Sequence, residues 1–195
     1  MRPLVLASTS RYRAALLQRL GLPFSTFSPG VDESARSGET PAETAVRLAG
    51  AKARAAASAH PDALIVGSDQ VAACGAEAIG KPDSHEAAVV QLRRLSGRSV
   101  VFHTGLALLD SATGACRSEC VDVVSTYRVL NDAEIEAYLR REQPYDCAGS
   151  VKSEGLGIAL FDSIASDDPT ALIGLPLIRL SALLRAAGVA VPPLP

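Results

Sequence analysis

Residues 4–20 read LVLASTSRYRAALLQRL, and this stretch joins a short apolar run to an amphipathic one. The apolar run over 4–7 predicts a buried strand. The spacing of the leucines that follow predicts a helix over 11–20, which Gly21 ends. Three hydroxyl residues and two arginines stand where the strand passes into the helix. Hydroxyls, free amides and nearby cations suit a phosphate, so this junction is a candidate anion site in an α/β protein.

The rest of the chain continues this alternation of strands and helices. Further strands are predicted over 24–28, 63–66, 99–109 and 116–129, and further helices over 41–59, 83–95, 131–140 and 175–187. Thr40 with Glu43, and Asn131 with Glu134, form capping boxes that mark two of the helix starts. Residues 71–79 predict a hairpin around Gly75, and the glycine-punctuated segment 148–164 is predicted to be strand-like. Strand–helix units mixed with hairpins predict one α/β domain over 1–195 with a mixed sheet.

Composition excludes several function classes. The chain has 195 residues and a formal net charge of −2, so no overall basic field points to nucleic acid. Apolar runs are too short for a membrane span or a secretory leader, and the cytoplasm is the expected location. The four cysteines are dispersed and form no CxxC pair, so zinc ligation is not predicted. Cys116 and Cys120 are instead expected on one face of an extended segment.

Residues 75–81 match the GxxxxGK core of a nucleotide-binding P-loop, but the context argues against that motif. The motif needs Ser or Thr next, followed by a helix, whereas Pro82 offers neither a hydroxyl nor an amide hydrogen. Lys81 itself remains a candidate. The chain has sixteen arginines and only three lysines, Lys52, Lys81 and Lys152, so a lysine here indicates a compact charge such as a phosphate requires.

Two acidic residues follow apolar runs. Asp69 stands in GSDQ after the run 63–66, where a carboxylate can act as a general base or hold a metal, or else simply make a turn hydrogen bond. Glu33 lies in a glycine-flanked loop, where solvation alone also accounts for it. The cluster 152–157 places Lys152 and Glu154 among glycines, which suits either close approach of a ligand or an exposed turn. Taken together, these groups suit a triphosphate with a divalent cation.

Six motifs occur in the same order as in the Maf-like nucleoside triphosphate pyrophosphatases, which this chain resembles over essentially its whole length. They are ASTSRYRAALL at 7–17, VDE at 31–33, AGAKA at 49–53, GSDQV at 67–71, GKP at 80–82 and CAGSVKSEGLG at 147–157. The fourth and sixth motifs resemble the branch of the family that acts on 7-methyl-GTP. The resemblance implies cleavage between the α and β phosphates, assisted by a divalent cation (Mg2+, Mn2+ or Co2+). It also implies a homodimer and a two-lobed mixed α/β fold with a central cleft, related to that of inosine triphosphate pyrophosphatases.

The resemblance also implies roles for individual residues. Asp69 matches the proton acceptor, and it would hold the metal together with Glu33. The other polar cleft positions are Ser8, Ser10, Arg13, Lys52 and Lys81, and the base-specificity positions are Tyr12, Gln70 and Glu154. Two positions depart from the family pattern: Arg11 stands where Pro is usual, and Tyr12 stands where the methyl-GTP branch often has Trp.

Two other functions remain open from the sequence. The chain could act on another nucleoside triphosphate, or it could be a nucleotide-binding regulator of septum formation in cell division. An unpaired Asp69 beside the phosphates favours the enzyme, because a pure binder gains nothing from a carboxylate that repels its ligand.

Overall fold

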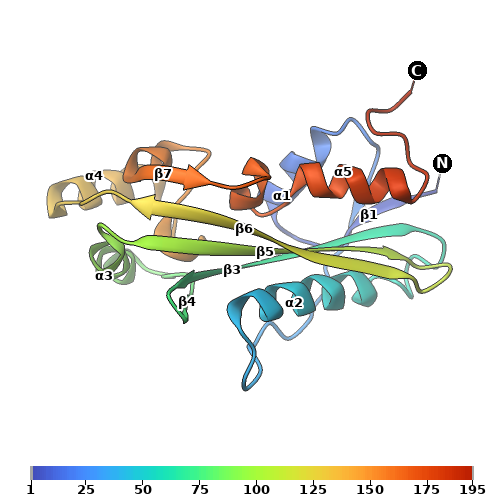
Figure 1. The fold of residues 1–195 in the computed structure, drawn as a ribbon, viewed down its shortest axis with the longest axis horizontal. Coiled ribbons are helices and arrows are strands. Elements are labelled where there is room, and N and C mark those ends of the chain that lie inside the picture. The colour runs from blue at the N-terminus through green and yellow to red at the C-terminus, as the bar shows by residue number, and fades with distance from the viewer. Residues whose placement is uncertain (1, 195) are drawn as a thin grey trace.

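The computed structural model describes residues 2–194 as one mixed sheet with helices on both faces (Figure 1). Within these residues, the strands are ordered β2–β1–β3–β5–β6–β7, and β4 pairs with the far part of β3. The strands are β1 Leu4–Leu6, β2 Ser25–Thr26, β3 Leu64–Cys74, β4 Glu77–Ile79, β5 Ser99–Asp110, β6 Cys116–Tyr127 and β7 Phe161–Ala165. β1 is parallel to β2 and β3, and the other pairings are antiparallel, so the predicted mixed sheet is confirmed.

Five helices of the described chain divide between the two ends of the long strands. They are α1 Arg11–Gln18, α2 Pro41–Ala55, α3 His85–Leu95, α4 Asp132–Glu142 and α5 Leu177–Ala186. Figure 1 shows α1 and α5 on one face of the sheet, α2 on the opposite face, and α3 with α4 at the other end. Each group covers its own apolar cluster, around Leu17 and Leu106 for α1 and α5, Ala49 and Ile65 for α2, and Leu92 for α3. The chain therefore has two lobes, joined by β3, β5 and β6.

Local capping signals account for the helix starts. The Thr40 side chain accepts from the Glu43 amide, the Glu43 carboxylate accepts from the Thr40 amide, and Pro41 occupies the first turn. Asn131 and Glu134 form the same box at α4. α2 ends at Ala55, four residues before its predicted end at residue 59. α3 ends at Leu95 as predicted, and α4 continues to Glu142, two residues beyond its predicted end.

Two glycines let α2 lie directly on the sheet. A Cβ atom at Gly67 would stand 2.0 Å from the Ala49 carbonyl oxygen, and one at Gly105 would stand 2.1 Å from that of Ala45. Any side chain at either position would push the helix away, because both contacts are with helix backbone. This close approach places Lys52, on α2, against the middle of β3.

The structure corrects the position of the GSDQ motif. The strand predicted over 63–66 continues to Cys74, so Asp69 lies inside β3 rather than beyond its end. The reason is long-range: β5 pairs with β3 continuously from Leu64 to Ala73. On the other edge of β3, β1 covers Leu64–Val66 and β4 covers Ala72–Cys74. Among the described strands, none pairs with this edge between them.

The predicted strand-like segment over 148–164 is wrong for most of its length. The chain forms 3-10 turns at Ala148–Ser150 and Leu156–Leu160, and only Phe161–Ala165 is a strand. Gly149 and Ser150 have φ values of 71° and 54°, which extended backbone does not allow. At Gly157 a Cβ would lie 2.4 Å from the Lys152 carbonyl oxygen, so the chain turns back on itself here.

Of the helices in residues 2–194, none has both the length and the apolar character that crossing a membrane requires.

Candidate active site

A cleft of about 880 Å3 opens at the uncovered edge of β3, between the two lobes. One wall comes from the loop before α1 and from α2, and the other comes from the segment after β4 and the turn near Asp146. Nine of the ten residues proposed from the sequence line it: Ser8, Ser10, Tyr12, Arg13, Glu33, Lys52, Asp69, Gln70 and Lys81. The tenth, Glu154, lines an adjoining smaller cavity. The fold thus brings together side chains that are dispersed along the chain.

An ion-pair cluster lies in the cleft, in which Lys52 and Asp69 are buried and Glu33 is exposed, so the expectation of an unpaired Asp69 is wrong. The Lys52 ammonium lies 2.6 Å from Asp69 Oδ1 and 2.5 Å from Glu33 Oε1. Lys52 is 5% exposed and Asp69 is 8% exposed. Removing Lys52 would leave the buried Asp69 charge uncompensated, so these two groups are held in place together. The three charges sum to −1, and the nearby charges of Arg13 and Lys81 act on the same carboxylates.

The pKa of the Glu33 carboxylate is shifted below its ordinary value. Burial raises the pKa of Glu33, but the hydrogen bond and charge of Lys52, with the charges of Lys81 and Arg13, outweigh it, so its pKa is lowered overall. A carboxylate that stays charged can interact with cations over the whole neutral range.

The two carboxylates fit a divalent cation. Carboxylate oxygens are the ligands that Mg2+ prefers, and Mg2+ in nucleotide sites is bound by one or two carboxylates together with substrate phosphates. Glu33 and Asp69 each use one oxygen on Lys52 and keep a second oxygen, which has no hydrogen bond to the described residues. Which ion they take, and whether they take one, stays a prediction.

Arg13 is fixed at the end of the cleft by a backbone carbonyl. Its Nε donates to the Gly174 oxygen at 2.8 Å, and its terminal nitrogens make no hydrogen bond within residues 2–194. Burial lowers the pKa of the guanidinium, and the Asp69 and Glu33 carboxylates partly offset this shift. Arg13 is half-buried, and its unpartnered terminal nitrogens suit a bidentate contact with a phosphate.

The two loop serines have structural roles of their own. Ser8 Oγ accepts from the Ser10 amide at 3.1 Å, and Ser10 Oγ caps α1 by accepting from the Arg13 amide at 3.4 Å. These bonds hold the loop in one shape and leave each hydroxyl its own hydrogen to donate. Lys81 differs from these held groups, because it is exposed and makes no hydrogen bond or ion pair with residues 2–194. Its ammonium is free to follow a ligand.

The smaller cavity, of about 150 Å3, joins the cleft beside α1 and contains Tyr12, Gln70 and Glu154. The Gln70 amide nitrogen is committed to Thr104 Oγ1 and to the carbonyl oxygens of Ala171 and Leu172. Only the amide oxygen of Gln70 therefore remains for a ligand. Glu154 forms no ion pair or side-chain hydrogen bond with the described residues.

Lys152 and Arg11 make contacts around this cavity that affect its residues. Lys152 donates to the carbonyl oxygen of Glu142 at 2.9 Å, so it does not neutralise the neighbouring Glu154. The Arg11 guanidinium lies over the Tyr12 ring, 4.9 Å from its centroid, and donates to the hydroxyl at 2.8 Å. Arg11, the residue that departs from the family pattern, thus occupies one face of the ring.

Two acidic residues shape the site without having been predicted from the sequence. Asp146 lines both cavities; its position directly before the CAGS motif was the available signal. Asp168 is fully buried and accepts from the amides of Thr170, Ile178 and Arg179. It thereby ties the start of α5 to the turn Pro169–Ile173, which presents the Gly174 carbonyl to Arg13. The Asp-Pro-Thr sequence was a local signal for that cap.

Comparison with known proteins identifies the relatives of this chain. The family profile described as "Maf-like protein" matches residues 3–187. A protein of Albidiferax ferrireducens named 7-methyl-GTP pyrophosphatase is 56% identical over 190 residues, which are 97% of this chain and 96% of the relative. A protein of the same name from Thiobacillus denitrificans is 58% identical over 186 residues, covering 95% and 92%. Another from Pseudomonas fluorescens is 57% identical over 192 residues, covering 98% and 100%.

Proposed function

Because the chain belongs to the Maf-like family, we propose that it is a nucleotide pyrophosphatase that hydrolyses 7-methyl-GTP to 7-methyl-GMP and pyrophosphate. Relatives of this name match it at 56–58% identity over nearly their full length. The observation that carries the proposal is the Glu33–Lys52–Asp69 cluster at the uncovered edge of β3, in a cleft of about 880 Å3. A cleft of that volume is within the usual range for small-molecule sites. Such an enzyme removes a modified nucleotide from the pool.

Asp69 is the group best placed to accept a proton. A water oxygen would attack the α-phosphorus, the bond from that phosphorus to the α–β bridging oxygen would break, and the water proton would pass to Asp69. The Asp69 oxygen that does not contact Lys52 has two lone pairs, so it can take this proton on one while the other remains for a cation. Lys52 holds the other oxygen at 2.6 Å and so fixes the orientation of the carboxylate.

The cations of the cleft would stabilise the charge that develops on the phosphates. Lys81 is exposed and unpaired within residues 2–194, so it can follow the leaving pyrophosphate, whereas Arg13 is held at Gly174 and can only bind in place. A divalent ion held by Glu33 and Asp69 would supply further neutralisation of phosphate charge. The attack of water on the α-phosphorus requires only two residues of the chain: Asp69 accepts the proton, and Lys52 orients the Asp69 carboxylate.

The small cavity suits guanine because it offers acceptors. Gln70 has only its amide oxygen free, and Glu154 has an unpaired carboxylate. Guanine presents N1–H and N2–H2 donors, whereas adenine presents an acceptor at N1. Methylation at N7 makes the base cationic, which favours both the Glu154 charge and the free face of Tyr12, by about 0.5–2 kcal/mol for the ring.

The experiment is a pyrophosphate-release assay on a panel of nucleoside triphosphates that includes GTP and 7-methyl-GTP, with Mg2+ or Mn2+. We expect a higher kcat/KM for 7-methyl-GTP than for GTP. Glu154→Gln should reduce that preference by about tenfold, as expected for one charged hydrogen bond. The matched control is Glu86→Gln, the same change at an exposed position of α3. This variant should keep the wild-type ratio of kcat/KM for 7-methyl-GTP to kcat/KM for GTP.

Each outcome of the nucleotide-panel assay leads to a different conclusion about the chain. If wild type shows no preference for the methylated base, the substrate assignment falls and another triphosphate of the panel takes its place. If nucleotides bind but none releases pyrophosphate, the chain is a nucleotide-binding regulator rather than an enzyme. A homodimer stays a prediction, and light scattering from the purified chain tests it.

A further inference from the structure

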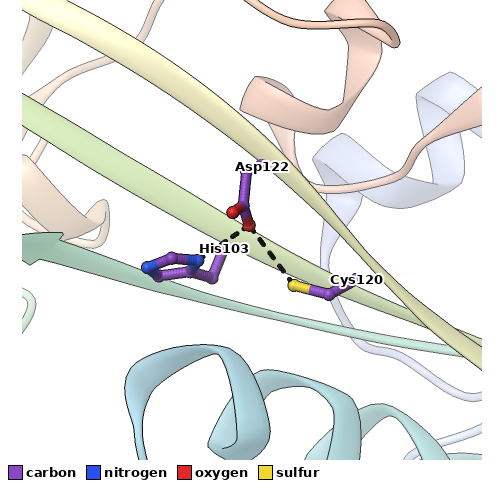
Figure 2. Close-up of side chains that lie close together, drawn as sticks. All are labelled: His103, Cys120 and Asp122. Atoms are coloured by element: carbon purple, nitrogen blue, oxygen red, sulfur yellow. Dashed lines mark hydrogen bonds and ion pairs between the residues drawn. The ribbon is translucent and has the colours of Figure 1, made fainter.

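Three potential metal-binding side chains meet on the sheet, outside the cleft. Figure 2 shows His103, on β5, facing Cys120 and Asp122, on β6. The register explains the meeting: His103 pairs with Asp122 and Gly105 pairs with Cys120, so the three side chains share one face. No short sequence motif contains them, because the two strands come together only through the β5–β6 hairpin.

The three donor atoms are close enough to share one ion. One ligand atom from each side chain lies within 4.8 Å of the other two. His103 Nδ1 is 2.7 Å from Asp122 Oδ1, and Cys120 Sγ is 3.5 Å from the same oxygen. Ligand atoms around a tetrahedral zinc ion are separated by about 3.3–3.6 Å, as its bond lengths of about 2.0–2.3 Å require. Bound Zn2+ would require the contact between His103 and Asp122 to open from 2.7 Å to that spacing.

The chemistry of the set selects the class of metal. Imidazole nitrogen, thiolate sulfur and carboxylate oxygen together are ligands typical of Zn2+, whereas Mg2+ takes oxygen ligands. Three protein ligands leave the fourth tetrahedral position open for water or another small ligand. Cys120 also lines a surface cavity of about 680 Å3 beside the start of α2, which provides a path of entry.

Helix α2 lies between Cys120 and Asp69, whereas His103 pairs with Val71, which lines the cleft. Asp69, Gly105 and Cys120 are paired in one row across β3, β5 and β6, and α2 crosses the sheet over Gly105. Asp69 therefore lies on one side of the helix and Cys120 on the other. None of the three cluster residues is among those that line the cleft.

We propose that His103, Cys120 and Asp122 form a Zn2+ site that is separate from the catalytic cleft. Because two strands supply the ligands, bound Zn2+ would cross-link β5 to β6 and stabilise the folded chain. The site does not depend on the identity of the nucleotide substrate.

The test is a calorimetric titration of the metal-free full chain with Zn2+. Excess Mg2+ is present throughout to occupy sites made of oxygen ligands. We expect one Zn2+ per chain, a rise in Tm, and a thiolate-to-metal charge-transfer band when Co2+ replaces Zn2+. Cys120→Ser should abolish the band, and His103→Ala should weaken Zn2+ binding at least about 100-fold, since even indirect supporting residues cost 10–100-fold. Cys116→Ser is the matched control on the same strand and face, and it should change neither.

The alternative is that His103 and Asp122 form only a cross-strand hydrogen bond. The proposal is overturned if wild type binds no Zn2+ under these conditions, or if Cys120→Ser and His103→Ala bind it as wild type does. Should either variant unfold, Asp122→Asn replaces it, because Asn keeps a hydrogen-bond acceptor for His103 and removes the charged ligand. Unchanged affinity in that folded variant also overturns the proposal.

Discussion

Gly105→Ala tests whether the contact of α2 with the sheet controls the active site. A Cβ at this position would lie 2.1 Å from the Ala45 carbonyl oxygen and 2.8 Å from the Val46 nitrogen. Both atoms belong to the backbone of α2, so no side-chain rotation relieves the clash. The helix must move away from the sheet, and Lys52 on the same helix moves with it.

The size of the effect follows from these distances. Raising 2.1 Å to the 3.0 Å below which real contacts are essentially never found requires a shift of about 0.9 Å. A rigid shift of that size lengthens the 2.6 Å contact between Lys52 and Asp69 to about 3.5 Å, where a hydrogen bond is lost. Misplacement by about 1 Å can cost about 100-fold in rate. Overpacking should also reduce the free energy of unfolding by about 1–3 kcal/mol.

The assay compares kcat/KM for pyrophosphate release with Tm, at a temperature where each variant is folded. Gly114→Ala is the control: Gly114 lies in the turn between β5 and β6, has a φ of 78°, and a Cβ there would meet no atom within 4 Å. Its strain of about 1–2 kcal/mol should lower Tm and leave kcat/KM unchanged. If Gly105→Ala retains wild-type kcat/KM, the position of α2 does not control the site. If both variants lose activity equally, the loss follows stability instead.

Three further predictions concern single charged groups. Asp69→Asn should lower kcat for pyrophosphate release by about 10²–10⁴-fold; a near wild-type rate would remove Asp69 from the mechanism. Lys81→Ala should lower kcat and leave Tm unchanged, since this side chain makes no contact that stabilises the described chain; the reverse result would make it structural. The hydrogen bonds of Arg47 lower the pKa of Glu39 to about 2 from 4.5, so the pair stabilises the fold above pH 4.5 and loses its contribution as pH falls to about 2. Glu39→Gln should therefore flatten the acid limb of a Tm-against-pH curve, and an unchanged limb would contradict the pairing.

Structural features that depend on contacts within a few residues could be predicted from the sequence. The capping boxes at Thr40 and Asn131 join residues three positions apart, so the sequence alone located both helix starts. The β5–β6 hairpin was legible for a similar reason, because its turn connects its own strands. The residue types of the cleft were also identified, through motifs that resemble those of one family.

Features that depend on residues far away in the sequence could not be predicted from it. Ser68 and Gln70 read as the end of a strand because they are polar, yet they lie inside β3. Their side chains are satisfied by carbonyl oxygens of Gly174 and Ala171, more than 100 positions away. A buried polar group is tolerated when it is hydrogen-bonded, but no local sequence pattern predicts a hydrogen-bond partner that is distant along the chain. The turns over 148–160 were also missed. The glycines that permit this compact backbone also occur at the ends of strands, so the sequence pattern does not distinguish the two.

The sequence by itself therefore determined where the two helices with capping boxes begin and most of the charged residues of the cleft, although not Asp146. Only the tertiary structure decided how those charges combine: Lys52 lies between Glu33 and Asp69, Arg13 is held by Gly174, and Asp69 stands mid-strand at a gap between β1 and β4. The same holds for the meeting of His103 with Asp122 across two strands. Caps and turns are settled by neighbours along the chain, whereas strand register and ion pairing minimise the free energy of the whole packed fold, in which the partners are 17 to 161 positions apart.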